Sequence, residues 1–252
     1  MTRTIAAQEL RLMFRSPLAW VIAALMQVVF AWLFLSALEQ FVTTQAQLAN
    51  RPDGPGVTAF IIARFVAPAA IIMLLISPLL CMRTLAEEQR NGTLVLLRAA
   101  PVSMTSIVLG KFLGVFLLQW GLISLAFLMP LSLRFFTSPD LGSLFTAWLG
   151  VSLFAAACTA LSLYFSAITR QPLIAAFSAF AALLFLWLLG TGSFSSETAS
   201  AVLHGLSMPR HLNSFFRGML DTRDLVYFGL FILLFLSLAV IKLDSLRYTE
   251  PR

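Results

Sequence analysis

Six long apolar segments divide this 252-residue chain, and they constrain its fold more than any other feature. They cover residues 18–38, 66–82, 107–133, 144–168, 173–190 and 225–243. A helix needs about 20 mostly apolar residues to cross a bilayer. Charged residues make up 11% of the chain, whereas soluble domains carry about 25%. We therefore expect a single all-α integral membrane domain over residues 1–252, with six transmembrane helices.

Two features refine these boundaries. The second segment is short for a span unless it extends back through Phe60, which places Arg64 where its long side chain can reach the interface. Residues 169–172 leave room only for a tight hairpin between the fourth and fifth segments. The two cysteines, Cys81 and Cys158, fall in or beside apolar segments, and we interpret them as small buried hydrophobic residues.

The distribution of basic residues predicts the orientation. If both termini are cytoplasmic, most of the 17 Lys and Arg residues fall on the inner side, including Arg3, Arg11 and Arg15 beside the first segment. The net charge of +6 does not indicate a nucleic-acid partner, because the cations are scattered between apolar segments and form no basic stripe.

Residues 3–15 have helical periodicity and predict a helix that lies flat in the membrane interface. Its polar residues Gln8, Arg11 and Arg15 fall opposite a broad apolar arc. The arc consists of Ile5, Ala6, Leu10, Leu12, Met13 and Phe14. Glu9 lies within the apolar arc, so it needs a partner. Ser16-Pro17 should end this helix before the first span.

In the inner loop, residues 83–106, we expect the helix of the second span to continue over residues 83–90 and to end at Asn91-Gly92. A short crosswise helix should follow and end before Pro101. Thr93 can cap the short helix and Ser103 can cap the third span. Four consecutive apolar residues, 94–97, stand where water would meet them, which indicates a docking surface. The alternative is that these leucines dip back into the membrane interface.

The outer loop, residues 191–224, is longer than a plain connection requires. Residues 196–206 and 211–220 each have helical spacing of apolar side chains. We expect two external helices that fold back over the membrane or the helix bundle.

The sequence lacks the motifs that ATP hydrolysis and ion transport would require. It has no phosphate-binding loop, because the one Gly-Lys pair, Gly110-Lys111, has neither the preceding Gly nor the following Ser or Thr. We interpret Lys111 as an anchor at the cytosolic end of the third span. The deep parts of the spans carry no ionisable residue, which argues against an ion relay. Gln27 and Gln119 are expected to make helix–helix contacts.

A membrane-embedded enzyme is the competing class. Glu87-Glu88 resembles the paired glutamates of CAAX-type proteases, but Gly92 stands where that family has arginine. His204 and His211 fall on the opposite side of the predicted membrane. We therefore interpret the chain as a non-catalytic subunit.

Three stretches resemble the ABC type-2 permease family. The first is residues 8–19, QELRLMFRSPLA. The second is AEEQRNGT at 86–93, continued by APV at 100–102 and VLGK at 108–111. The third, residues 211–228, resembles the subgroup named after gliding motility. The similarity extends over the whole chain.

This resemblance implies an exporter-type permease subunit in the bacterial inner membrane, driven by a separate dimeric ATPase that binds ATP and Mg. It also implies a second permease chain and no cofactor in this one. The implied ATPase-coupling residues are Glu87, Glu88, Arg90, Gly92, Thr93, Leu94, Leu96, Leu97 and Pro101. The implied external gate comprises His211, Phe215, Arg217, Gly218, Asp221, Arg223 and Asp224. An alternative with the same partner is a mechanotransmission subunit that acts on an external protein or polymer without transport.

Overall fold

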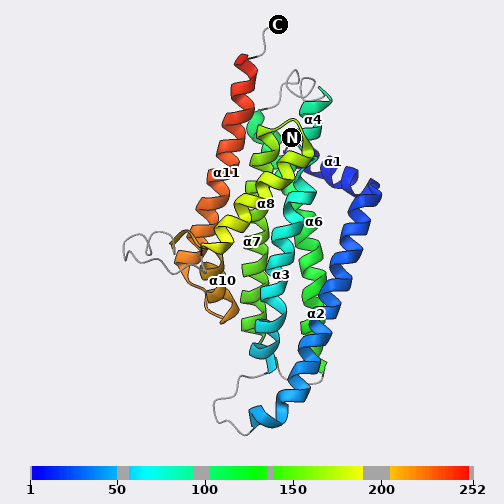
Figure 1. The fold of residues 1–252 in the computed structure, drawn as a ribbon, viewed down its shortest axis with the longest axis vertical. Helices are drawn as coiled ribbons and strands as arrows, with labels where there is room; N and C mark the ends of the chain where they lie inside the picture. The colour runs from blue at the N-terminus through cyan, green and yellow to red at the C-terminus, as the bar shows by residue number, and fades with distance from the viewer. Residues whose placement is uncertain (1, 50–56, 93–102, 136–138, 190–204, 250–252) are drawn as a thin grey trace.

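The computed structural model describes residues 2–49, 57–92, 103–135, 139–189 and 205–249. Every regular element in these ranges is a helix (Figure 1). The elements are α1 (Thr2–Arg15), α2 (Pro17–Ala49), α3 (Val57–Cys81), α4 (Ala86–Arg90), α6 (Met104–Ser132), η1 (Leu133–Phe135), α7 (Leu141–Ile168), α8 (Pro172–Leu188), α10 (Met208–Phe216) and α11 (Thr222–Thr249).

Five helices are long and apolar enough to cross a membrane: α2, α3, α6, α7 and α11. They correspond to five of the six predicted spans. The remaining predicted span, residues 173–190, coincides with α8, which has 17 residues. At 1.5 Å per residue α8 is about 25 Å long, slightly less than the hydrocarbon core of about 30 Å. The chain is a multi-pass helical membrane protein.

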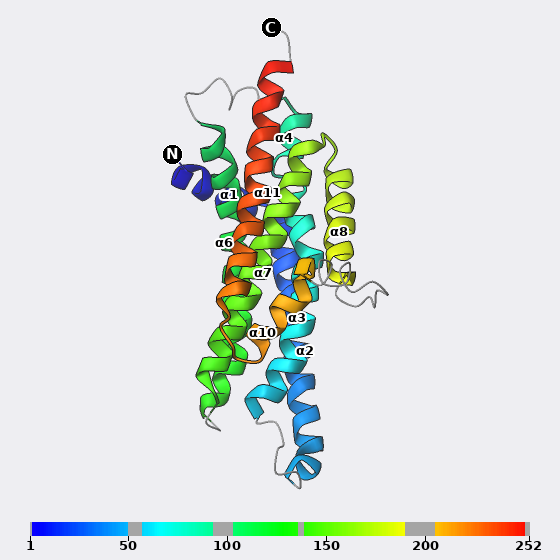
Figure 2. The ribbon, with the colours of Figure 1, turned by 90° about the vertical axis from the view of Figure 1, so that its left-hand side faces the viewer.

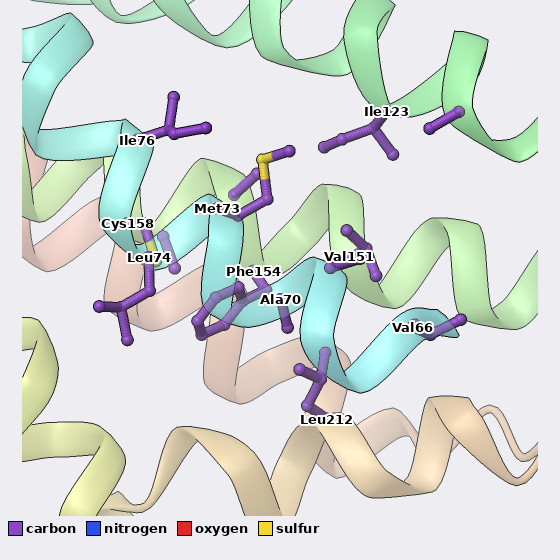
Figure 3. Close-up of a cluster of buried hydrophobic side chains, with 14 of the residues drawn as sticks. Val66, Ala70, Met73, Leu74, Ile76, Ile123, Val151, Phe154, Cys158 and Leu212 are labelled. Atoms are coloured by element: carbon purple, nitrogen blue, oxygen red, sulfur yellow. The ribbon is translucent and has the colours of Figure 1, made fainter. Parts of the chain in front are cut away.

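Helix α7 forms the centre of the bundle and contacts α3, α6, α8, α10 and α11 (Figure 2). Small side chains let its neighbours approach closely, including Ala147, Gly150 and Ala160. Side chains of α3, α6, α7 and α10 interlock in the core around Met73 and Phe154 (Figure 3). Cys81 and Cys158 are free and buried, as expected.

The boundaries of the second span and of the hairpin confirm the sequence-based predictions. Helix α3 begins at Val57 and contains both Phe60 and Arg64, whose guanidinium carbon lies 5.6 Å from the Phe60 ring centroid. Pro172 is the first residue of α8, four residues after α7 ends at Ile168. Helix α2, in contrast, continues to Ala49, well beyond the predicted end at residue 38.

The predicted continuous helix over residues 83–90 is wrong. Helix α3 ends at Cys81, residues 82–85 form a turn, and α4 begins at Ala86. The stop at Asn91-Gly92 is confirmed, because α4 ends at Arg90 and Gly92 has a φ of +72°. The cap on the third span is also confirmed, since the Ser103 hydroxyl accepts a hydrogen bond from the Ser106 N–H.

The two glutamines within the spans, the half-buried Gln27 and the buried Gln119, make the expected helix–helix contacts. Gln119 Nε2 donates to Ser77 Oγ of α3 at 3.1 Å, and Thr159 Oγ1 of α7 donates to Gln119 Oε1 at 2.7 Å. Gln27 Nε2 of α2 donates to the Leu122 carbonyl of α6 at 2.8 Å. These bonds join α2, α3, α6 and α7 without placing a charge inside the bundle.

Candidate coupling site

Helix α1 runs across the bundle axis and packs on the first half of α6 (Figure 1). Two glycines four residues apart, Gly110 and Gly114, allow this close contact. A Cβ atom at Gly110 would lie 2.7 Å from the Ile5 side chain, and one at Gly114 would lie 2.7 Å from Glu9 Cβ. The buried residues of α1 are Ala6 and Glu9. The glutamate in the apolar arc therefore faces the protein.

Glu9 meets its partner in Lys111 of α6. Lys111 Nζ lies 3.1 Å from Glu9 Oε2, 2.7 Å from Glu88 Oε1 of α4 and 2.9 Å from the Thr84 carbonyl oxygen. The Lys111 side chain is only 3% exposed. All three of its N–H donors are used. We call these four residues, Glu9, Thr84, Glu88 and Lys111, the Lys111 cluster.

The turn between α3 and α4 makes this cluster possible. It leaves the Thr84 carbonyl outside any helix, where Lys111 can donate to it. Ser166 Oγ of α7 accepts hydrogen bonds from the N–H groups of Leu85 at 3.2 Å and Ala86 at 3.0 Å. A neighbouring helix thus supplies partners that the start of α4 would otherwise lack.

A side-chain hydrogen bond from Gln89 also connects α4 to α7. Gln89 Nε2 donates to the Ala167 carbonyl, near the C-terminus of α7, at 2.8 Å. The short helix is therefore joined to α7 by neutral hydrogen bonds and to α6 by the Glu88–Lys111 ion pair, and Lys111 in turn pairs with Glu9 of α1. Removing one partner of a buried ion pair lowers the stability of the fold, because the other charge is left buried and unpaired. A displacement of α4 should move α1 and α6 with it.

The anchoring of the cytosolic end of the third span by Lys111 stays a prediction, but the structure shows that its ammonium group is buried inside the protein. Glu87 is half-buried, whereas Arg90 and Gly92 are exposed. The other predicted coupling residues, Thr93, Leu94, Leu96, Leu97 and Pro101, lie outside the described residues.

At the predicted external gate, α10 packs deeply on α7. Phe215 is fully buried, and a Cβ at Gly150 would lie 2.6 Å from Phe215 Cβ. Thr146 Oγ1 donates to the Phe215 carbonyl at 3.1 Å. Gly150 lies nine residues beyond Leu141, so α10 reaches about 13 Å along α7. Helix α10 is thus part of the bundle rather than a helix lying beyond it.

A second polar contact joins α10 to α11. His211 Nδ1 lies 2.6 Å from Asp224 Oδ1, and its ring stacks on Tyr227 with centroids 4.0 Å apart. Gly218 has a φ of +77° and lies against Ser143 of α7. The remaining predicted gate residues are exposed: Arg217, Asp221 and Arg223. The sequence does not show that Tyr227 completes this contact.

The structure separates the residues that the protease interpretation would need together. Glu88 lies on α4 at the end of the bundle near the two termini, and His211 lies on α10, well away from it (Figures 1 and 2). His204 lies outside the described ranges. Among the residues described, no group of three or more His, Cys, Asp or Glu side chains converges.

The architecture defines a multi-pass helical membrane protein in which α1, α4 and α6 are joined through the Lys111 cluster. A sequence profile of the ABC-2 family transporter proteins matches residues 3–217 of this chain. The chain therefore belongs to the ABC-2 transporter family and is a membrane subunit of an ABC transporter. A comparison with curated proteins gives no match.

Proposed function

We propose that this chain is the non-catalytic, exporter-type permease subunit of a transporter in which a separate ATPase dimer binds ATP and Mg. Family membership supports the permease role. The observation that carries the coupling proposal is the Lys111 cluster, because it connects α4 to α1 and α6 through buried charges. The bacterial inner membrane is the proposed location, and the third motif favours the gliding-motility-type subgroup.

In this proposal the ATPase contacts residues 93–99, which directly follow α4 in the chain. Closure of the ATPase dimer pushes this segment, and α4 passes the movement to α1 and α6. Glu88 transmits the load through Lys111, while Glu87, Arg90 and Gly92 lie at the surface that the partner approaches. Helices α2, α3, α6, α7, α8 and α11 act as the six spans.

The external gate is proposed at α10 and the start of α11. In this proposal, opening of the gate changes two contacts, the His211–Asp224 pair and the close packing of Phe215 on Gly150. Gly218 forms the bend between these helices, and the exposed Arg217, Asp221 and Arg223 face away from the core. A second permease chain, identical or related, supplies the other wall of the pathway.

A tagged copy of the chain, purified in mild detergent from its native membranes, should carry a separate nucleotide-binding chain in equal amount. The complex should hydrolyse ATP, and vanadate should inhibit it. The isolated permease chain should show no ATP-competed nucleotide crosslinking, because it has no phosphate-binding loop. Recovery of the permease without any ATPase chain, even after crosslinking in membranes, would contradict the proposal.

The proposed orientation places both termini in the cytoplasm. It is supported by the basic residues beside the first span and by the position of both termini toward one end of the bundle (Figure 1). A reporter enzyme active only in the periplasm should be inactive when fused after residue 252. The same reporter inserted between residues 135 and 139 should be active. The reverse pattern of activities would invert the topology and remove residues 93–99 from the reach of an ATPase.

A further inference from the structure

A polar groove of about 950 Å³ lies between α4 and the turn that joins α7 to α8. Three arginines line it: Arg83 from the turn before α4, Arg90 from the end of α4, and Arg170 from the α7–α8 turn. All three are exposed. We call this feature the arginine groove. It is separate from the Lys111 cluster, whose four residues do not line it.

The charge of the arginine groove favours an anion. Among the described residues that line it, one carries a carboxylate, Glu87, and three carry guanidinium groups. Guanidinium groups bind phosphate oxygens through paired hydrogen bonds. The side-chain amides of Asn91 and Gln171 also line the groove and can donate to hydroxyl or phosphate oxygens. These groups together suit a phosphate that carries a polar substituent.

An apolar surface continues directly from the groove. Leu173 lines its edge and is 65% exposed. Ile174 and Phe177 follow on α8, with exposures of 51% and 65%. A soluble phosphate or an acidic protein segment would use the arginines and leave this apolar surface unused. An anionic lipid would use both, with its phosphate in the groove and its acyl chains along α8.

We propose that the arginine groove binds the headgroup of an anionic phospholipid. Basic pockets at the membrane boundary of other helical proteins select such headgroups. The lipid lies where α8 begins, so its acyl chains cover the exposed side chains of a helix that is short for a span. Its headgroup bridges α4 and the α7–α8 turn. The groove shares Glu87 and Arg90 with the surface proposed for the ATPase, so the variants that test it change Arg83 and Arg170 instead.

The test uses the full chain in nanodiscs made from equal amounts of phosphatidylglycerol and phosphatidylethanolamine. Native mass spectrometry of the released protein should show phosphatidylglycerol enriched among the retained lipids. Arg83→Gln and Arg170→Gln should each lower this enrichment about fivefold, equivalent to about 1 kcal/mol per basic residue near the membrane surface. The matched controls Arg11→Gln and Arg15→Gln remove exposed arginines of α1 and should leave it unchanged.

Three results would overturn the lipid assignment. Equal retention of both lipids by the wild-type protein would show that the groove does not select an anionic headgroup. Loss of ATPase association in the Arg83 and Arg170 variants, with the lipid ratio unchanged, would show that the groove is a protein contact. Equal losses of enrichment in the groove variants and in the α1 controls would show only a general effect of charge, and would also contradict the proposal.

Discussion

Replacing Lys111 with methionine should lower the free energy of unfolding by about 3–5 kcal/mol, because it leaves the buried carboxylate of Glu9 and the half-buried carboxylate of Glu88 without their cation. Glu9 and Glu88 approach the same ammonium group at 3.1 and 2.7 Å, so the variant also places like charges beside each other. Methionine preserves most of the side-chain volume, which limits the loss of packing. Unfolding can be followed by thermal denaturation of the purified protein in one detergent and lipid mixture.

A matched triple variant separates charge from packing. Lys111→Met combined with Glu9→Gln and Glu88→Gln keeps the shapes of the side chains and removes all three charges. Neutral replacement of a whole buried ionic group is often tolerated, so most of the lost stability should return. If Lys111→Met alone stays within about 0.5 kcal/mol of wild type, the pairs behave like exposed ones. The Lys111 cluster would then not be a structural connection.

The sequence predicts the helical spans because their signal is local. Each depends on length and composition within one segment, and the five long helices lie where the apolar segments place them. The Ser103 cap and the stop at Gly92 are also local, since both depend on residues within one turn of the helix end. The end of α2 is less predictable, because residues 39–49 are helical without being continuously apolar.

The coupling site is less predictable from the sequence because its partners are far apart in the chain. Glu9 and Lys111 are separated by 102 residues. The anomaly of a glutamate in an apolar arc shows that Glu9 needs a partner, but not which one. A second clue is the spacing of Gly110 and Gly114 around Lys111, which predicts a closely packed helix at that position.

The turn at residues 82–85 and the packing of α10 on α7 are also hard to predict, because both depend on contacts between residues far apart in the chain. The turn at residues 82–85 is stable because Ser166 and Lys111, from other helices, bond to its backbone. How deeply α10 packs on α7 depends on the contact between Phe215 and Gly150, two residues that lie 65 positions apart in the sequence. Neither contact has a periodic signature in the sequence. The tertiary contacts therefore decide these two features.

Leu96→Glu and Leu97→Glu should each weaken association with the ATPase at least about tenfold. Burying a leucine contributes about 1.5–3 kcal/mol, and each factor of ten in affinity corresponds to about 1.4 kcal/mol. An unpaired carboxylate in an apolar cleft adds a further cost. The change lies outside the apolar segments predicted as spans, so membrane insertion should be unaffected. Leu96→Met and Leu97→Met keep the apolar volume and serve as controls.

ATP hydrolysis by the complex purified through the tagged permease, measured per mole of permease, tests directly whether residues 93–99 couple the ATPase to this chain. The two methionine variants should hydrolyse ATP at the wild-type rate. The two glutamate variants should hydrolyse it at a rate near background, with equal amounts of permease in the membrane. Wild-type hydrolysis and wild-type recovery of the ATPase in both glutamate variants would show that residues 93–99 are not the ATPase contact, and the coupling mechanism proposed for this chain would be wrong.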